Sequence, residues 1–79
     1  MQLKVLSLTG ILYEGDVTSV NAQTTSGEIT VLPHHRPLIS VLKAGALVFE
    51  KENGEKQSLP VSSGTIEVSA KNEVTVLVS

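Results

Sequence analysis

The chain contains no cysteine and no tryptophan, and only two aromatic residues, Tyr13 and Phe49, among its 79 residues. Without cysteine, disulfide bonds and thiolate metal sites are excluded. Because rings are scarce, valine, leucine and isoleucine must fill the interior, which favours a tightly packed sandwich over a ring-lined ligand cavity. No apolar run approaches the roughly 18 residues of a membrane-spanning helix, and no signal peptide is expected. We therefore expect a soluble, intracellular protein.

Charge is low and evenly spread. The net charge is −2, from six basic and eight acidic residues that are dispersed along the chain. A nucleic-acid surface needs basic residues gathered in a patch or stripe, so nucleic acid is not expected as a partner. A chain of 79 residues is near the lower size limit for a self-sufficient hydrophobic core. We expect one domain, residues 1–79, of modest stability.

Short alternating segments separated by turn residues predict an all-β fold, an antiparallel sandwich or barrel. A three-residue step from Val17 to Val20 interrupts the alternation and predicts a bulge. The segment Leu38–Ala44 fits a helical turn or a strand by period, and its β-branched residues and strand neighbours favour a strand. The predicted strands are Gln2–Leu8, Asp16–Thr24, Gly27–Leu32, Leu38–Ala44, Thr65–Ser69 and Val74–Val78.

Turn residues separate several of these strands. Asn53-Gly54, between charged flanks, predicts a hairpin with a type I′ turn, which needs positive φ at both central residues. Further turns are predicted at Ser62–Gly64 and at Lys71-Asn72.

Three leucines, Leu6, Leu8 and Leu77, fall on the strand face opposite the main alternation. One interpretation is that they form an exposed apolar patch, which would mark a surface for a partner. The alternative is that Leu6, Leu8 and Leu42 are core residues, since apolar strand residues are mostly buried.

The sequence shows no set of residues that would carry a reaction. His34 and His35 are adjacent, and neighbours on an extended chain point to opposite sides; Glu28 alone does not complete a metal site. No serine lies in a Gly-x-Ser-x-Gly elbow, and no glycine-rich phosphate loop is present. We predict no catalytic residue, no metal and no cofactor, which leaves a small hydrolase or metal protein as the weakest alternative.

The segment 27–38, GEITVLPHHRPL, is the most informative part of the chain. It predicts a short strand that leads into a loop stiffened by Pro33 and Pro37, each of which fixes φ. Between the two prolines, His34, His35 and Arg36 are expected on a rigid tip. The loop is either a solvated corner of the sandwich or a contact surface.

This segment, written Gly-Glu-x-x-Val-Leu-Pro-x-His-x-Pro-Leu, resembles the epsilon subunit of bacterial F-type ATP synthases. The resemblance covers essentially the whole chain, as the family's N-terminal β domain, and implies a flattened antiparallel sandwich of two five-stranded sheets. Most members continue into two C-terminal helices, so inhibition of ATP hydrolysis and ATP sensing are not carried over; the initiator Met1 favours an intact short chain. Further matching segments are Leu3–Ser7, Tyr13–Val17, Leu42–Gly45, Asn53-Gly54, Ser63–Val68 and Asn72–Leu77.

The resemblance implies a non-catalytic central-stalk subunit that links the gamma subunit to the membrane c ring and couples proton flow to ATP synthesis. It would be peripheral, at the cytoplasmic face of the bacterial inner membrane, without a cofactor. The implied gamma contacts are Ser7, Ser40 and Leu42. The implied c-ring contacts are Glu28, Thr30, His34, His35 and Arg36, of which Arg36 departs from the small residue usual before the second proline. The alternative is a free-standing sandwich that recognises a peptide or a small ligand.

Overall fold

The computed structural model describes all residues from Met1 to Ser79 and is built from eight strands without a helix. Every strand pair is antiparallel except β1 with β8, which is parallel. The strands are β1 (Gln2–Ser7), β2 (Gly10–Thr24), β3 (Gly27–Val31), β4 (Leu38–Leu42), β5 (Gly45–Lys51), β6 (Lys56–Val61), β7 (Gly64–Val68) and β8 (Glu73–Val78).

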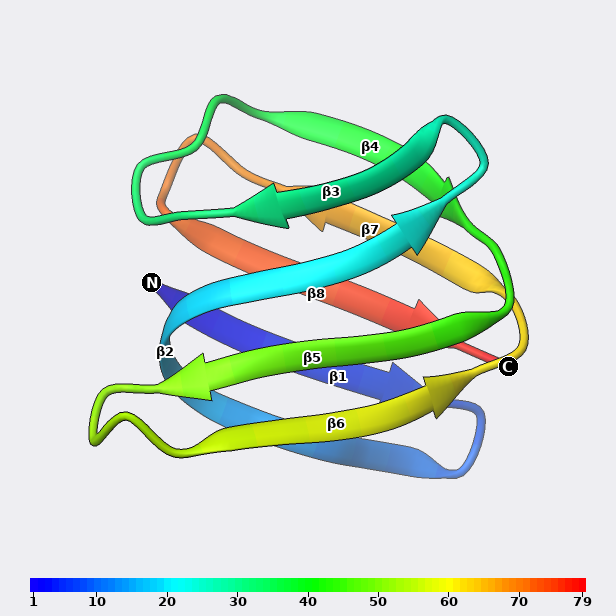
Figure 1. Ribbon diagram of the computed structural model, residues 1–79, viewed down its shortest axis with the longest axis horizontal. Coiled ribbons are helices and arrows are strands. Elements are labelled where there is room, and N and C mark those ends of the chain that lie inside the picture. The colour runs from blue at the N-terminus through cyan, green and yellow to red at the C-terminus, as the bar shows by residue number, and fades with distance from the viewer.

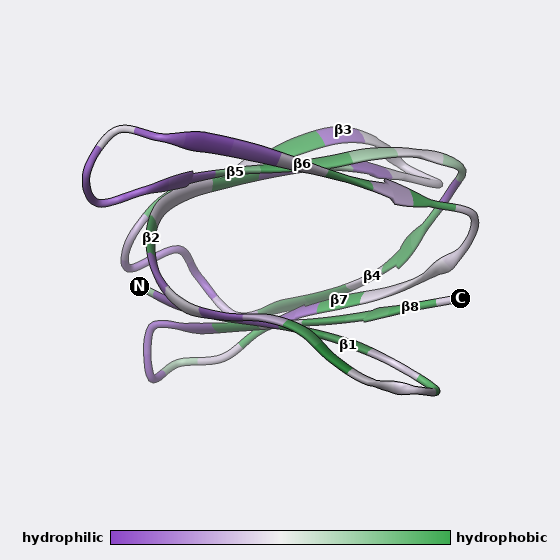
Figure 2. Cartoon of the chain, turned by 90° about the horizontal axis from the view of Figure 1, so that it is seen from below, coloured by the Kyte–Doolittle hydropathy of each residue, from purple (hydrophilic) through white to green (hydrophobic).

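The strands form two layers, which confirms the predicted all-β sandwich (Figures 1 and 2). One layer has the order β4-β7-β8-β1 and then the first part of β2; the other has the order β3, the second part of β2, β5 and β6. The layers thus hold five and four strand segments, so the expected count of five in each is not met in the second layer.

Strand β2 joins the two layers. Its residues Gly10–Asp16 pair with β1, and its residues Val17–Thr24 pair with β3 and β5. The pairing with β5 shifts register between Val17 and Ser19, which confirms the bulge predicted in this stretch. Thr18, the extra residue, donates a hydrogen bond from Oγ1 to the Glu50 carbonyl at 3.3 Å. A bulge strengthens local twist and bends the strand, which suits the passage of β2 between layers.

Most predicted strands are confirmed within one or two residues, including Leu38–Leu42 as a strand. The predicted start of β2 is six residues too late, since the strand begins at Gly10 and not at Asp16. A second register shift, opposite Val5 and Leu6, inserts an extra residue there and breaks the alternation on which the prediction rests.

The turn predicted as type I′ takes a different form. Asn53 has no positive φ, whereas Gly54 has φ 88°. The Gly54 N–H donates to the Lys51 carbonyl at 2.9 Å, and the Lys51 N–H donates to the Glu55 carbonyl at 2.8 Å. This is the three-residue hairpin loop in which the last residue is left-handed and forms a bulge. The other two predicted turns are confirmed between β6 and β7 and between β7 and β8.

The core lies between the layers and is almost entirely aliphatic. Its one large ring, Phe49, is fully buried and packs against Tyr13 with ring centroids 4.4 Å apart. The buried apolar residues are Leu3, Val5, Val17, Val20, Ala22, Val31, Leu42, Leu47, Phe49, Val61, Ile66, Val68, Val74 and Val76.

Thr24 is the one buried polar residue. Its Oγ1 donates to the Gly27 carbonyl at 2.7 Å and accepts the Ser26 N–H at 3.1 Å, which holds the β2–β3 hairpin together. We predict that Thr24→Val destabilises the domain by about 1–3 kcal/mol, because both partners lose their bond. Thr24→Ser, which keeps the hydroxyl, should cost about 1 kcal/mol or less. Urea unfolding measures both; equal stability of the two variants would contradict this role.

Gly64 opens β7 with φ +152°, and a Cβ there would overlap the Leu77 carbonyl oxygen in β8. Gly27 is a matched control, because its φ is also positive, +118°, but nothing lies within 4 Å of the place that a Cβ would take. We predict a cost of about 1–3 kcal/mol for Gly27→Ala from backbone strain and a larger cost for Gly64→Ala. The urea midpoints of the two variants measure the difference, and a Gly64→Ala variant more stable than Gly27→Ala would contradict this account.

Candidate protein-docking surfaces

An apolar row crosses the outer face of the five-stranded layer. Strand register places Val41 beside Thr65, Thr65 beside Leu77, Leu77 beside Leu6, and Leu6 beside Ile11. The side chains of Ile11, Val41 and Leu77 are 58%, 53% and 50% exposed. Five neighbouring strands thus contribute one residue each to a row that is apolar except for a threonine.

The β1–β2 hairpin extends this row beyond the edge of the sheet. Leu8, at its tip, is fully exposed at 101%, and Leu12 is 49% exposed. Leu12 is the extra residue of the register shift, which turns Ile11 to the same side as Leu6. We call Leu6, Leu8, Ile11, Leu12, Val41 and Leu77 the apolar face. The predicted exposure of Leu8 and Leu77 is confirmed.

The rest of the same outer face is mostly polar, with the exception of Ile39 on β4, which is 75% exposed beside Glu67. In the next row, Lys4 on β1 pairs with Glu14 on β2, and their charged groups are 3.5 Å apart. Beyond it, Gln2 lies beside Glu73 and Asp16. The face is therefore divided between an apolar half near the C-terminus and a charged half near the N-terminus. A contiguous exposed apolar surface with a polar rim is typical of a protein contact.

The three residues implied as gamma contacts lie in different surroundings. Ser7 is half-buried beside the apolar face, and its hydroxyl is 3.0 Å from that of Thr9. Ser40 is half-buried on β4, between exposed Ile39 and Val41. Leu42 is a correction: it is only 3% exposed and belongs to the core, so its side chain offers no surface to a partner. The alternation of β4 is the signal that would have selected Val41 instead.

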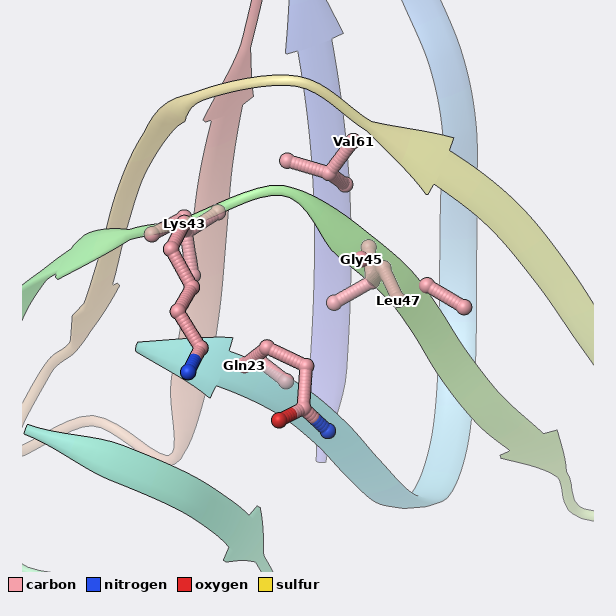
Figure 3. A pocket seen from close by; sticks show the side chains of 8 residues that line it. Gln23, Lys43, Gly45, Leu47 and Val61 are labelled. Atoms are coloured by element: carbon pink, nitrogen blue, oxygen red, sulfur yellow. The ribbon is translucent and has the colours of Figure 1, made fainter. Parts of the chain in front are cut away.

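A shallow hollow of about 320 Å³ adjoins the apolar face and is lined by Ser7, Leu8, Gly64, Thr65, Leu77, Val78 and Ser79. A second hollow, at the β4–β5 turn, has no internal volume open to a water molecule. Figure 3 shows Lys43 and Gln23 at this place, with the Gln23 side chain near Gly45. The first hollow widens the apolar face, and the second has no room for a ligand.

Strand β3 carries the first part of the implied c-ring set. It pairs only with β2 and is therefore an edge strand. Glu28 and Thr30 are exposed on it; Gln23 Nε2 donates to Glu28 Oε2 at 3.4 Å, and Asn21 Nδ2 donates to Thr30 Oγ1 at 2.9 Å. Both polar side chains are thus held in place and reach solvent.

The second part lies in the β3–β4 loop, Leu32–Pro37, where His34, His35 and Arg36 are all exposed. The Nδ1 atom of His35 is 2.7 Å from the Arg36 carbonyl oxygen. A carbonyl only accepts, so Nδ1 carries the proton, and Nε2 of this exposed residue has no hydrogen bond within the domain. In this tautomer Nε2 accepts a hydrogen bond, so a donor on a partner would complement it.

The structure separates the two parts of this set. Glu28 lies beside the β2–β3 hairpin, whereas the histidines follow the far end of β3 (Figure 1). The stretch of β3 from Glu28 to Val31 alone measures about 10 Å. Glu28 and His35 therefore form two ends of one strip along the sandwich edge, which we call the β3 strip: Glu28, Thr30, His34, His35 and Arg36.

No group of three or more His, Asp or Glu side chains is placed to hold a metal ion. The structure offers no helix with the length and hydropathy that a membrane crossing needs.

The family model for the β-sandwich domain of the ATP synthase delta/epsilon chain matches residues 1–79. The chain is 43% identical over 77 residues to the ATP synthase epsilon chain of Psychrobacter arcticus, covering 98% of this chain and 55% of that protein. It is 37% identical over 78 residues to the ATP synthase epsilon chain of a Nitratiruptor species, covering 99% and 60%. The chain thus spans somewhat over half the length of these relatives.

Solved structures show the same fold. A chain in the cryo-EM structure of the Euglena gracilis mitochondrial ATP synthase (OSCP, F1 and c ring) superposes with a TM-score of 0.91 at 25% identity, covering 96% of this chain and 48% of that one. A chain in the central stalk and c ring of the Tetrahymena thermophila enzyme superposes with a TM-score of 0.82 at 18% identity, covering 99% and 62%. With the match over residues 1–79, the chain belongs to the ATP synthase delta/epsilon family, as its β-sandwich domain.

Proposed function

We propose that this domain is a non-catalytic component of the central stalk of an F-type ATP synthase, peripheral at the cytoplasmic face of a bacterial inner membrane. It binds the gamma subunit through the apolar face and the c ring through the β3 strip, and so couples proton flow to ATP synthesis. Family membership and the central stalk and c-ring assemblies of its structural neighbours support this role.

The observation that carries the proposal is the division of one outer sheet face into an apolar and a charged half. Leu8, Ile11 and Leu77 expose at least half of their surface on a domain with 15 buried residues. Fully burying an exposed leucine or isoleucine contributes about 1.5–3 kcal/mol, and covering the exposed half of Ile11 or Leu77 contributes about half of that. A few of them account for a stable contact with gamma, and Ser7 at the margin can add a hydrogen bond.

The c-ring contact has a different character. The β3 strip is polar and exposed, and single exposed charge pairs contribute about 1 kcal/mol or less. Several weak bonds along the strip must act together to hold the domain on the ring. A rigid edge suits this, because Glu28 and Thr30 are already held by β2 side chains and lose little freedom on binding.

The gamma contact is tested by mixing the purified chain with the gamma subunit of the same source, using size-exclusion chromatography with light scattering. We expect a one-to-one complex. Leu77→Lys should weaken it at least about tenfold, because the contact loses a buried leucine and gains a charge. Glu73→Lys is the matched control, on the same strand and the same face but in the charged half, and should bind like the wild type.

Equal binding by the Leu77 variant would exclude the apolar face as the gamma contact. A folded wild-type chain that stays separate from folded gamma would contradict the rotor function and favour a free-standing recognition module for a peptide or a small ligand.

The c-ring contact is tested by the affinity of the gamma complex for purified c ring, with Glu28→Lys, His35→Ala and the double variant. We expect each substitution to weaken binding, and the two effects to add within about 0.5 kcal/mol, because Glu28 and His35 lie too far apart to interact. Unchanged affinity in the double variant would remove the strip from the contact, and strong coupling would contradict the separation along β3.

A further inference from the structure

The β3–β4 loop has a defined turn at its start. The His35 N–H donates to the Leu32 carbonyl at 3.1 Å, which closes a four-residue turn with Pro33 and His34 in the middle. Proline fixes its φ near −65°, and His34 has φ 66°. A proline followed by a residue of positive φ is the pattern of a type II turn.

His34 occupies a position that glycine or asparagine normally takes. A side chain at positive φ is crowded by its own backbone, so the turn has an alternative. In a type I turn the peptide between Pro33 and His34 is flipped and both central residues have negative φ. Something outside the turn must favour the observed form.

Asn72, in the β7–β8 turn, supplies this interaction. Its Oδ1 accepts the His34 N–H at 2.7 Å, across 38 residues of sequence. The flip to type I would turn this N–H away from Asn72. No other hydrogen bond joins the β3–β4 loop to the β7–β8 turn.

Asn72 is itself well anchored. It has φ 61°, a conformation that asparagine tolerates better than most residues, and it is half-buried. Its carbonyl accepts the Gln2 N–H at 3.2 Å. The backbone of Asn72 is therefore held by β1, and its side chain presents Oδ1 to the loop.

We propose that Asn72 is a positioning residue: it holds the Pro33-His34 peptide in the type II form and so sets the directions in which His34, His35 and Arg36 are presented. That the partner which binds these side chains is the c ring rests on the proposed function. The role of Asn72 in the loop does not.

Two substitutions separate the hydrogen bond from the backbone of Asn72. Asn72→Gly keeps a residue suited to positive φ and removes the acceptor, and Asn72→Asp keeps the acceptor. In NMR spectra of the chain, wild type and Asn72→Asp should show the strong contact between Pro33 Hα and the His34 amide proton that marks a type II turn. Asn72→Gly should lose it, and exchange of the His34 amide should rise about three- to tenfold.

A second-site variant checks the cause. Adding His34→Gly to Asn72→Gly should restore the Pro33 contact, because glycine favours positive φ without help. If Asn72→Gly alone leaves both the contact and the exchange rate of His34 unchanged, the positioning role is overturned.

The effect of Asn72 on partner binding is measured as the affinity of the complex of this chain with gamma for purified c ring. We expect Asn72→Gly to weaken it about three- to tenfold and Asn72→Asp to leave it unchanged. If the turn flips in Asn72→Gly while the affinity for c ring is unchanged, the c ring does not contact this loop. If wild type fails to bind the ring, the proposed function falls, while the NMR result still decides the role of Asn72.

Discussion

The structure depends on the passage of β2 from one layer to the other. Its first part completes the five-stranded layer beside β1, and its second part is the inner strand of the other layer, between β3 and β5. The bulge at Thr18 makes this bend possible, because an extra residue adds twist where the strand changes partners. Since Val17, Val20 and Ala22 on the same strand are buried, the bend and the core are specified together.

This arrangement determines which surfaces remain for partners. The interior takes one side of each strand, and a covered sandwich needs polar residues on the other. The layer of β5 and β6 follows this rule, and its hairpin is strongly hydrophilic (Figure 2). The five-stranded layer does not, because its register aligns Leu6, Ile11, Val41 and Leu77 in one exposed row. We infer that the departure reflects a contact with another protein rather than a requirement of the fold.

Local patterns in the sequence are enough to predict the sandwich, the strand at Leu38–Leu42, the bulge after Val17 and the exposure of Leu8 and Leu77. What they miss depends on tertiary pairing. Ile11 joins Leu6 on the outer face only because the β1–β2 register shifts by one residue. Leu42 is a different case, since the alternation of β4 already places it inward. The bond from His34 to Asn72 spans 38 residues, and no local signal could show it. The type I′ turn predicted at Asn53-Gly54 is wrong for a simpler reason. A hairpin loop that contains Asn-Gly can have two residues in a type I′ turn or three residues with a bulge at the glycine.

The central claim is that the apolar half of the five-stranded layer is the surface that gamma covers. Hydroxyl-radical footprinting of the chain, alone and with gamma, tests it directly, because leucine and isoleucine side chains are oxidised according to their exposure. The account predicts that Leu8, Ile11 and Leu77 become protected in the complex, while Leu59 on β6 in the opposite layer does not change. Protection confined to β5 and β6, with Leu8 and Leu77 still fully reactive, would contradict it.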